Sequence, residues 1–174
     1  ASGFDMRVIY HNRSRLPADV ERAFNASYVD FDTLFAQADH LVLVLPYSAA
    51  SHHIVDAAAL AKMQPTATLT NIARGGIVDE VALADALANG RLASAALDVF
   101  EGEPAVDPRL LALDNIVLTP HIASGSLATR RAMVTLAVDN LIAALGAGPD
   151  AGHPPSVIAP AKQDDTDAKR PGTA

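Results

Sequence analysis

Short apolar segments alternate with helical patterns from residue 6 to about residue 145. The apolar segments read as continuous runs rather than alternating ones, a pattern typical of strands buried on both faces of a parallel sheet. They cover residues 6–11, 27–29, 41–45, 67–72, 93–99 and 115–118. Strands that alternate with helices in this way predict right-handed βαβ units, and therefore an α/β fold with a doubly wound parallel sheet.

The helical patterns have start and stop signals of their own. The segment 79–88 begins with Asp79 and Glu80, acids that suit a helix N-terminus, and it stops at Asn89-Gly90, which suits a C-cap. A longer helix is expected over 126–145, because its apolar residues recur on one face. The expected helices are 32–36, 55–62, 79–88 and 126–145, and the stripe on the last consists of Met133, Leu136, Ala137, Leu141 and Leu145.

The composition excludes several classes of function. The chain has 174 residues, half of them hydrophobic, which is enough for one domain with a core. Its formal net charge of -7 argues against a nucleic-acid partner or an anionic membrane surface. It has no cysteine, so no disulfide or thiolate metal site is expected, which fits a cytoplasmic protein. We expect neither a signal peptide nor a membrane-spanning segment. The start at Ala1 suggests a piece of a longer protein.

Three motifs follow apolar runs and carry ionisable residues. They are residues 71–79 with Arg74, residues 98–104 with Glu103, and residues 119–125 with His121. Residues just past the carboxyl ends of parallel strands line one crevice, where ligands bind. An arginine, a carboxylate and a histidine that converge there can hold an anionic substrate and move a proton.

These motifs resemble those of the D-isomer-specific 2-hydroxyacid dehydrogenases, and most closely those of the glyoxylate/hydroxypyruvate reductase branch. The resemblance runs from Gly3 to about Pro155 and includes Leu45-Pro46 after a strand. It implies a nucleotide-binding domain inserted into a substrate domain that both chain ends build. Residues 1–145 would then be a partial, Rossmann-like dinucleotide-binding domain, residues 146–158 an extended return segment toward the substrate domain, and residues 159–174 a disordered tail.

The resemblance places the family's Gly-x-Gly-x-x-Gly turn and opening strand just before residue 1. These 174 residues do not contain that turn, whose amides and helix N-terminus carry the cofactor pyrophosphate. The N-terminal substrate lobe is not among them either. The activity is therefore expected of the complete protein, and the isolated chain is expected to bind cofactor weakly and to be inactive.

The resemblance also implies roles for the three ionisable residues. Arg74 would bind the 2-oxo acid through its planar guanidinium, and His121 would be the general acid/base. Glu103 would pair with His121 and favour the imidazolium form. Glu101 is the rival carboxylate; Glu103 is preferred because the catalytic glutamate of the family immediately precedes a proline, here Pro104.

The cofactor preference is predicted from the end of the first strand. Enzymes that prefer NAD place an acid there, whereas this chain has Asn12, Arg13 and Ser14, with Arg15 behind them. The first three side chains can donate to a 2′-phosphate, and Arg15 adds positive charge, so NADP is preferred, with NAD as the alternative. The remaining residues expected near the cofactor are Pro46, Ile72, Ala73, Arg74, Asp98, His121, Ala123 and Ser124. For Asp98, a helix-capping role is the alternative to a contact with the cofactor.

The sequence leaves several functions to weigh. The first is an NADPH-dependent reductase of a small 2-oxo acid, expected to be a cytoplasmic homodimer when complete. The alternatives are a non-catalytic cofactor-sensing or interaction protein of the same fold, and an inactive truncated product. A serine hydrolase built on Ser124 is rejected because no Gly-x-Ser-x-Gly elbow is present. A metal site at His52, His53 and Asp56 is rejected because adjacent histidines should point apart and the resembling family uses no metal.

Overall fold

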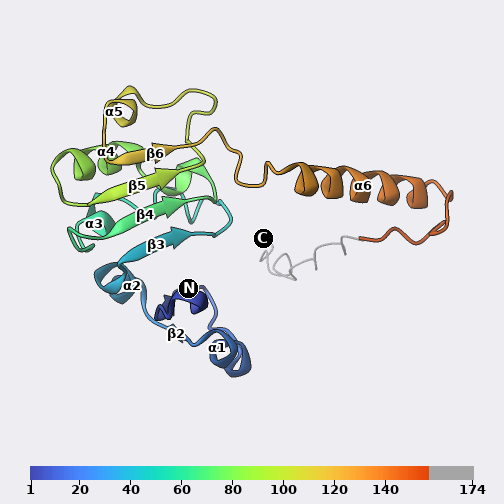
Figure 1. The fold of residues 1–174 in the computed structure, drawn as a ribbon, viewed down its shortest axis with the longest axis horizontal. Helices are drawn as coiled ribbons and strands as arrows, with labels where there is room; N and C mark the ends of the chain where they lie inside the picture. Colours follow the sequence, from blue (N-terminus) through green and yellow to red (C-terminus); the bar gives the residue numbers. More distant parts are fainter. Residues whose placement is uncertain (157–174) are drawn as a thin grey trace, which may run out of the picture. The chain divides into compact units, whose positions relative to one another are not determined.

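The computed structural model describes residues 1–156. Contacts within the chain divide it into two units, Ala1–Ala123 and Ser124–Ala174. The expected disordered tail, residues 159–174, lies outside the described residues. The first unit contains the strands and all but one of the described helices, which alternate along the chain (Figure 1).

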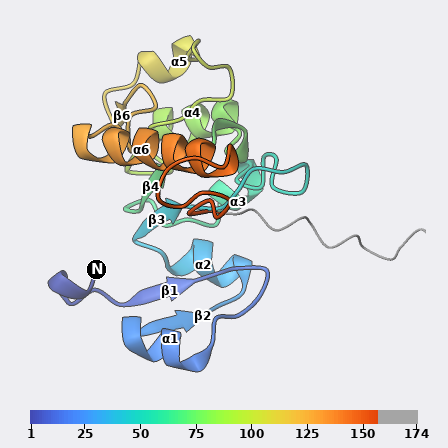
Figure 2. The same ribbon diagram turned by 90° about the vertical axis from the view of Figure 1, so that its right-hand side faces the viewer.

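A small parallel sheet opens the first unit. Strands β1 (Val8–Tyr10) and β2 (Ala26–Tyr28) pair in parallel and are joined through α1 (Ala18–Phe24), a helix that the sequence analysis missed. Figure 2 shows β1 and β2 side by side, with α1 next to them. A short 3-10 turn, η1 (Ser2–Phe4), precedes this sheet.

A four-stranded parallel sheet forms the centre of the first unit. Its order is β3-β4-β5-β6, so each strand lies beside its neighbour in the sequence. This arrangement confirms the predicted α/β fold with a parallel sheet, although the six strands form two sheets instead of one. The strands are β3 (His40–Leu43), β4 (Thr68–Asn71), β5 (Ser94–Leu97) and β6 (Ile116–Leu118). The connecting helices are α2 (Phe31–Gln37), α3 (Ala57–Leu60), α4 (Glu80–Ala88) and α5 (Pro108–Leu111).

Aspartates fix where the connecting helices begin. The side chain of Asp79 accepts hydrogen bonds from the backbone amides of Val81 and Ala82, so the predicted start of α4 is confirmed. Side-chain oxygens satisfy amides that have no partner inside the helix. Asp30, Asp56 and Asp107 do the same for α2, α3 and α5.

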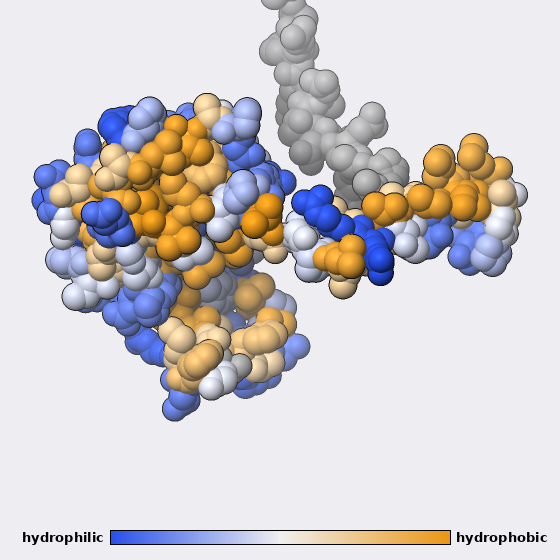
Figure 3. Space-filling model, turned by 45° about the horizontal axis from the view of Figure 1, so that its top comes forward, coloured by the Kyte–Doolittle hydropathy of each residue, from blue (hydrophilic) through white to orange (hydrophobic). Residues whose placement is uncertain are grey.

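The prediction that the strands are buried on both faces is wrong. In β3, Leu41 and Leu43 are buried, whereas Val42 between them is 51% exposed. Alternate residues of a strand point to opposite faces, and the core of this unit lies on the face of Leu41 and Leu43, where side chains of α2 to α5 pack. Apolar side chains consequently remain at the surface of the first unit, as they do in the second (Figure 3).

The second unit is built around α6 (Leu127–Ala144), close to the predicted 126–145. Ser126 caps it by accepting from the amide of Thr129. The segment after the helix is not extended as predicted. It turns at residues 149–152, because the Gly152 amide donates back to the Ala143 carbonyl over 2.8 Å. Within residues 1–156, no helix combines the length and the apolar character needed to cross a membrane.

Candidate active site

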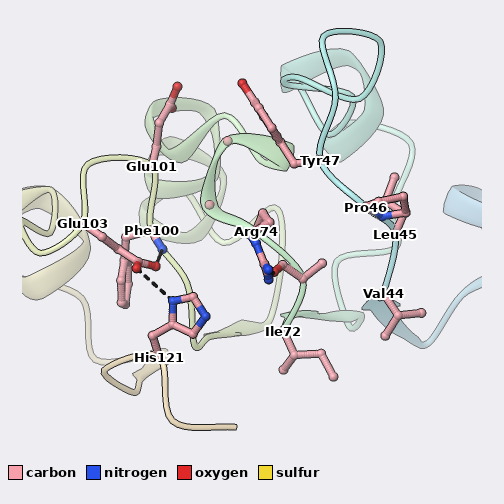
Figure 4. Close-up of a pocket in the computed structure, with 13 residues that line it drawn as sticks. Val44, Leu45, Pro46, Tyr47, Ile72, Arg74, Phe100, Glu101, Glu103 and His121 are labelled. Carbon is pink, nitrogen blue, oxygen red and sulfur yellow. Dashed lines mark hydrogen bonds and ion pairs between the residues drawn. The ribbon is translucent and has the colours of Figure 1, made fainter. Parts of the chain in front are cut away.

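A cavity of about 980 Å³ opens at the carboxyl ends of the four-stranded sheet. Its walls come from the segments that follow the strands: residues 44–47 after β3, residues 72–76 after β4, three residues after β5, and His121 after β6. Figure 4 shows Arg74, Glu103 and His121 around this cavity. The structure therefore brings the three predicted ionisable residues to one site.

His121 and Glu103 form a hydrogen-bonded pair at the cavity. The Nδ1 atom of His121 lies 2.9 Å from Oε2 of Glu103, and the other carboxylate oxygen accepts from the backbone amide of Phe100 over 2.9 Å. The bond from His121, the Phe100 amide and the more distant charge of Arg74 together hold the pKa of Glu103 below its ordinary value. Glu103 is therefore an anion at neutral pH. Because it contacts Nδ1, the other ring nitrogen of His121, Nε2, is free to face Arg74 (Figure 4).

Asp98 holds the loop that carries His121. Its carboxylate accepts from the backbone amides of Ile122 and Ala123, both over 2.8 Å, and from the hydroxyl of Thr119. Burial raises the pKa of Asp98, but these hydrogen bonds outweigh it and leave the pKa below its ordinary value. The side chain does not line the cavity, so the structure shows it positioning the loop; the expected contact with cofactor stays a prediction.

The backbone of His121 is in a left-handed conformation, with φ of 53°. Non-glycine residues rarely adopt it, and such residues concentrate at functional sites. Three hydrogen bonds to Asp98 surround this turn and hold it. The direction of the imidazole is thus fixed by a carboxylate that lies outside the cavity.

Arg74 lies on a tightly packed loop. The buried side chain of Asn71 bridges this loop, accepting from the Ala73 amide and donating to the Arg74 carbonyl. At Gly75 a Cβ atom would lie 1.9 Å from the carbonyl carbon of Phe100, so no other residue fits there without displacing the backbone. Close packing of the loops after β4 and β5 therefore sets where the guanidinium of Arg74 emerges.

The two rival carboxylates have different partners. Glu103 pairs with His121, whereas Oε2 of Glu101 lies 2.8 Å from Nε2 of His53. The amide of Glu101 donates to Glu80, whose pKa is raised by burial. Geometry thus separates Glu101 from the imidazole of His121.

The structure contradicts the expectation that His52 and His53 point apart. Their rings stack with centroids 3.9 Å apart and an interplanar angle of 22°. His53 has a left-handed backbone, with φ of 49°, which removes the regular alternation of side chains that the expectation assumed. Asp56 takes no part in this cluster, because its side chain caps α3.

The predicted cofactor residues fall into separate places. Pro46, Ile72 and Ala73 line the cavity. Asn12, Arg13 and Ser14 follow β1 and are exposed, and they are not part of the cavity. Ala123 ends the first unit, while Ser124 begins the second and is not placed relative to the cavity.

The positive charge that Arg15 was expected to add after β1 is paired with a carboxylate of the same chain. Its guanidinium makes two hydrogen bonds of 2.9 Å to the carboxylate of Glu21. Tyr10 donates to the same carboxylate over 2.7 Å. The hydrogen bonds from Arg15 and Tyr10 lower the pKa of Glu21 to about 2, so this ion pair is intact at neutral pH.

Some residues of the cavity were not singled out from the sequence. Tyr47 and Phe100 line it, and each follows a strand within a few residues. Their place after predicted strands was the available signal, since the crevice lies at the carboxyl ends. The hydroxyl oxygen of Tyr47 also lies 3.1 Å from Nδ1 of His52.

A parallel sheet flanked by helices, with a cavity at the carboxyl ends of its strands, defines a Rossmann-like α/β domain. The family described as "D-isomer specific 2-hydroxyacid dehydrogenase, NAD binding domain" matches residues 1–123. The chain belongs to this family.

Relatives with curated names agree with this assignment. The chain is 51% identical over 144 residues to glyoxylate/hydroxypyruvate reductase B of Pectobacterium atrosepticum, covering 82% of this chain and 45% of that protein. It is 45% identical over 143 residues to glyoxylate reductase of Thermococcus onnurineus, covering 82% and 42%. The chain therefore spans less than half the length of these relatives.

Solved structures show the same fold. The glyoxylate reductase from Paecilomyes thermophila aligns with a TM-score of 0.77 and 42% identity, covering 83% of this chain and 43% of that one. The NADPH-dependent glyoxylate/hydroxypyruvate reductase from Sinorhizobium meliloti, in complex with NADP and malonate, aligns with a TM-score of 0.77 and 35% identity, covering 90% and 50%.

Proposed function

We propose that this chain is the catalytic part of the nucleotide-binding domain of an NADPH-dependent reductase that acts on a small 2-oxo acid such as glyoxylate or hydroxypyruvate. The observation that carries the proposal is the 2.9 Å pair of His121 and Glu103 at the same cavity as Arg74. The names of the relatives from Pectobacterium and Thermococcus support the substrate class.

The cavity fits a nicotinamide cofactor on one side. Val44, Leu45, Pro46 and Ile72 form an apolar wall, which suits the flat face of an uncharged ring. Arg74 and His121 face the same space with polar groups (Figure 4). When bound, the cofactor supplies the hydride that reduces the substrate carbonyl carbon.

Arg74 binds the anionic substrate in this proposal. Its guanidinium offers a planar set of donors that matches a carboxylate, and it can also donate to the adjacent carbonyl oxygen. Nη1 of Arg74 already donates to the Ala73 carbonyl over 2.6 Å, which restricts the side chain and leaves its other nitrogens for the substrate. Fixing the donors in advance lowers the entropy lost on binding.

His121 supplies the proton to the carbonyl oxygen as it becomes an alcohol. Glu103 accepts from Nδ1, so the proton to be transferred is on Nε2. The negative charge of Glu103 stabilises the imidazolium that must exist before the transfer. In the reverse direction, the same nitrogen accepts the proton of a 2-hydroxy acid.

The preference for NADPH rests on the residues after β1. Arg13 is exposed and no acid follows the strand at Asn12 or Ser14, so a 2′-phosphate would meet donors there. The Sinorhizobium relative is described as NADPH-dependent and was solved with NADP, which supports this proposal. The homodimer and the cytoplasmic location stay predictions for the complete protein.

The test replaces His121 in the complete protein. His121→Asn is the informative variant, because asparagine tolerates the left-handed backbone that this position requires. Turnover with glyoxylate should fall about 10²- to 10⁴-fold, the contribution of a positioned general acid, while NADPH binding measured by fluorescence stays within a few-fold. The matched control is His40→Asn, a histidine bonded to Thr68 at the other end of β3.

Unchanged turnover in His121→Asn would refute the assignment. NADPH binding without turnover of any 2-oxo acid by the unaltered protein would favour the non-catalytic, cofactor-sensing alternative. Loss of both binding and turnover in the control would show that the assay reports folding instead of chemistry.

A further inference from the structure

Three potential metal ligands meet at the rim of the cavity, apart from the pair of His121 and Glu103. They are His52, His53 and Glu101, and one ligand atom from each lies within 4.8 Å of the other two. His52 and His53 belong to the segment between β3 and α3, whereas Glu101 follows β5. The fold thus assembles this group from segments about 50 residues apart.

The group is open to solvent and already partly ordered. Nε2 of His53 lies 2.8 Å from Oε2 of Glu101, and the two side chains are 35% and 43% exposed. The ring of His52 stacks on that of His53, and the Tyr47 hydroxyl lies 3.1 Å from Nδ1 of His52. An ion from solution can therefore reach these atoms without opening the core.

The backbone holds the two histidines together. The left-handed conformation of His53 is fixed by its amide, which donates to the Gly76 carbonyl over 2.8 Å. The next strand-like contact, between Val55 and Val78, ties the same segment to the loop of Arg74. Both imidazoles are therefore presented by a backbone that is anchored independently of the metal.

We propose that His52, His53 and Glu101 form a binding site for a divalent transition-metal ion, with Zn²⁺ as the best match. Two imidazoles and one carboxylate are a ligand set that Zn²⁺ takes in open sites, with a fourth position left to water. Ligand atoms around tetrahedral zinc are separated by roughly 3.3 Å at bond lengths of about 2.0–2.1 Å. The ligand atoms of the three side chains already lie within 4.8 Å of one another, and the 2.8 Å separation between Nε2 of His53 and Oε2 of Glu101 would widen when the ion binds.

An ion at this site would link the loops after β3 and β5. Glu101 and Tyr47 line the cavity, so the ion would sit at its edge and restrict movement of both loops. Oxygen-preferring Mg²⁺ should bind far more weakly, because imidazole nitrogens are poor ligands for it. This inference does not depend on the proposed reductase activity.

The experiment is a calorimetric titration of the untagged, full 174-residue chain with ZnCl₂ in metal-free buffer, repeated with MgCl₂. We expect one Zn²⁺ per chain and no saturable Mg²⁺ binding. His53→Gln and Glu101→Gln should each weaken Zn²⁺ binding at least about tenfold, since even residues that only support a ligand contribute about 10- to 100-fold. The matched control is His40→Gln, which removes an exposed histidine outside the group and should bind as the unaltered chain does.

Two further measurements keep the result interpretable. Circular dichroism of each variant checks that it is folded, and His52→Gln replaces any variant that is not. Co²⁺ titration followed by visible absorption reports nitrogen and oxygen ligands in a tetrahedral site. Absence of saturable Zn²⁺ binding, or equal affinity in the unaltered chain and in the variants of His52, His53 and Glu101, would overturn the proposal.

Discussion

Glu103→Gln in the complete protein tests the proposed acid most directly. The carboxylate of Glu103 accepts two hydrogen bonds, one from the Phe100 amide and one from Nδ1 of His121. A glutamine has the same size but only one acceptor oxygen, so its NH₂ group must face one of these two donors. Retaining the Phe100 bond leaves Nδ1 of His121 facing an NH₂ group in place of a carboxylate oxygen.

The expected loss follows from the strength of this pair. A hydrogen bond to a charged group contributes about 1.5–3 kcal/mol, and about 1.4 kcal/mol corresponds to a factor of ten in rate. The side chains of His121 and Glu103 are 48% and 36% exposed, so solvent screening places the effect at the low end of that range. Glyoxylate reduction by Glu103→Gln should therefore be about tenfold slower at neutral pH.

The assay is the loss of NADPH absorbance as a function of pH. Because the pKa of Glu103 is lowered in the fold, the pair with His121 is intact above the ordinary carboxyl range and is lost as pH falls through the lowered pKa. The variant lacks this anion at every pH, so its deficit should be full at neutral pH and should shrink as pH falls through the lowered pKa of Glu103, where the unaltered carboxylate is protonated too. In Glu101→Gln, whose carboxylate pairs with His53, the deficit should be clearly smaller.

An unchanged pH profile in Glu103→Gln would refute this reasoning. So would a larger loss in Glu101→Gln, which would make Glu101 the partner of the acid. Cofactor affinity serves as the internal control, because neither carboxylate is proposed to bind NADPH.

The other predictions concern stability and cofactor choice. Gly75→Ala should lower the free energy of unfolding by about 1–3 kcal/mol or more in denaturant titrations, because its Cβ would meet the Phe100 backbone. The control is Gly102→Ala, whose Cβ would make only an ordinary contact at 3.7 Å, so its free energy of unfolding should change little. In the complete protein, Arg13→Ala should weaken NADPH binding about tenfold and NADH binding much less, and equal losses in fluorescence titrations would remove the argument for NADP. The ionised Glu21 stabilises the fold above its ordinary pKa of 4.5, and this contribution is lost as pH falls toward about 2. In Glu21→Gln the melting temperature should therefore depend less on pH in this range. A melting temperature that falls with acid as steeply as in the unaltered chain would contradict the ion pair.

The strands and longer helices could be predicted because their signals are local. The run 41–45 is apolar throughout, and Asp79 marked the start of α4. The helices α1 and α5, of seven and four residues, were not predicted, although α2 and α3 are equally short. For α5 a signal was present, since Asp107 followed by Pro108 is typical of a helix start.

The burial of the strands could not be predicted in the same way. An apolar run shows that a strand tolerates burial, but which face is covered depends on where the helices pack. In β3 only Leu41 and Leu43 face them, and Val42 does not.

The candidate site could be predicted in its membership but not in its geometry. The order of the motifs pointed to Arg74, Glu103 and His121, and the parallel sheet brings their loops to one cavity. The left-handed backbone at His53 and His121 could not be predicted, because a histidine in a sequence does not by itself indicate this conformation. For that reason neither the stacked rings of His52 and His53 nor the turn held by Asp98 could be foreseen.

The uncovered face of the four-stranded sheet affects how the chain behaves in the test tube. Val42, Thr70, Ala96 and Val117 form one row across it, and the valines at its two ends are 51% and 63% exposed. Sulfate and similar salts strengthen association between such surfaces, because they are excluded from the protein surface. The chain should therefore be salted out readily, and dilute buffers without sulfate are the appropriate conditions for keeping it monodisperse.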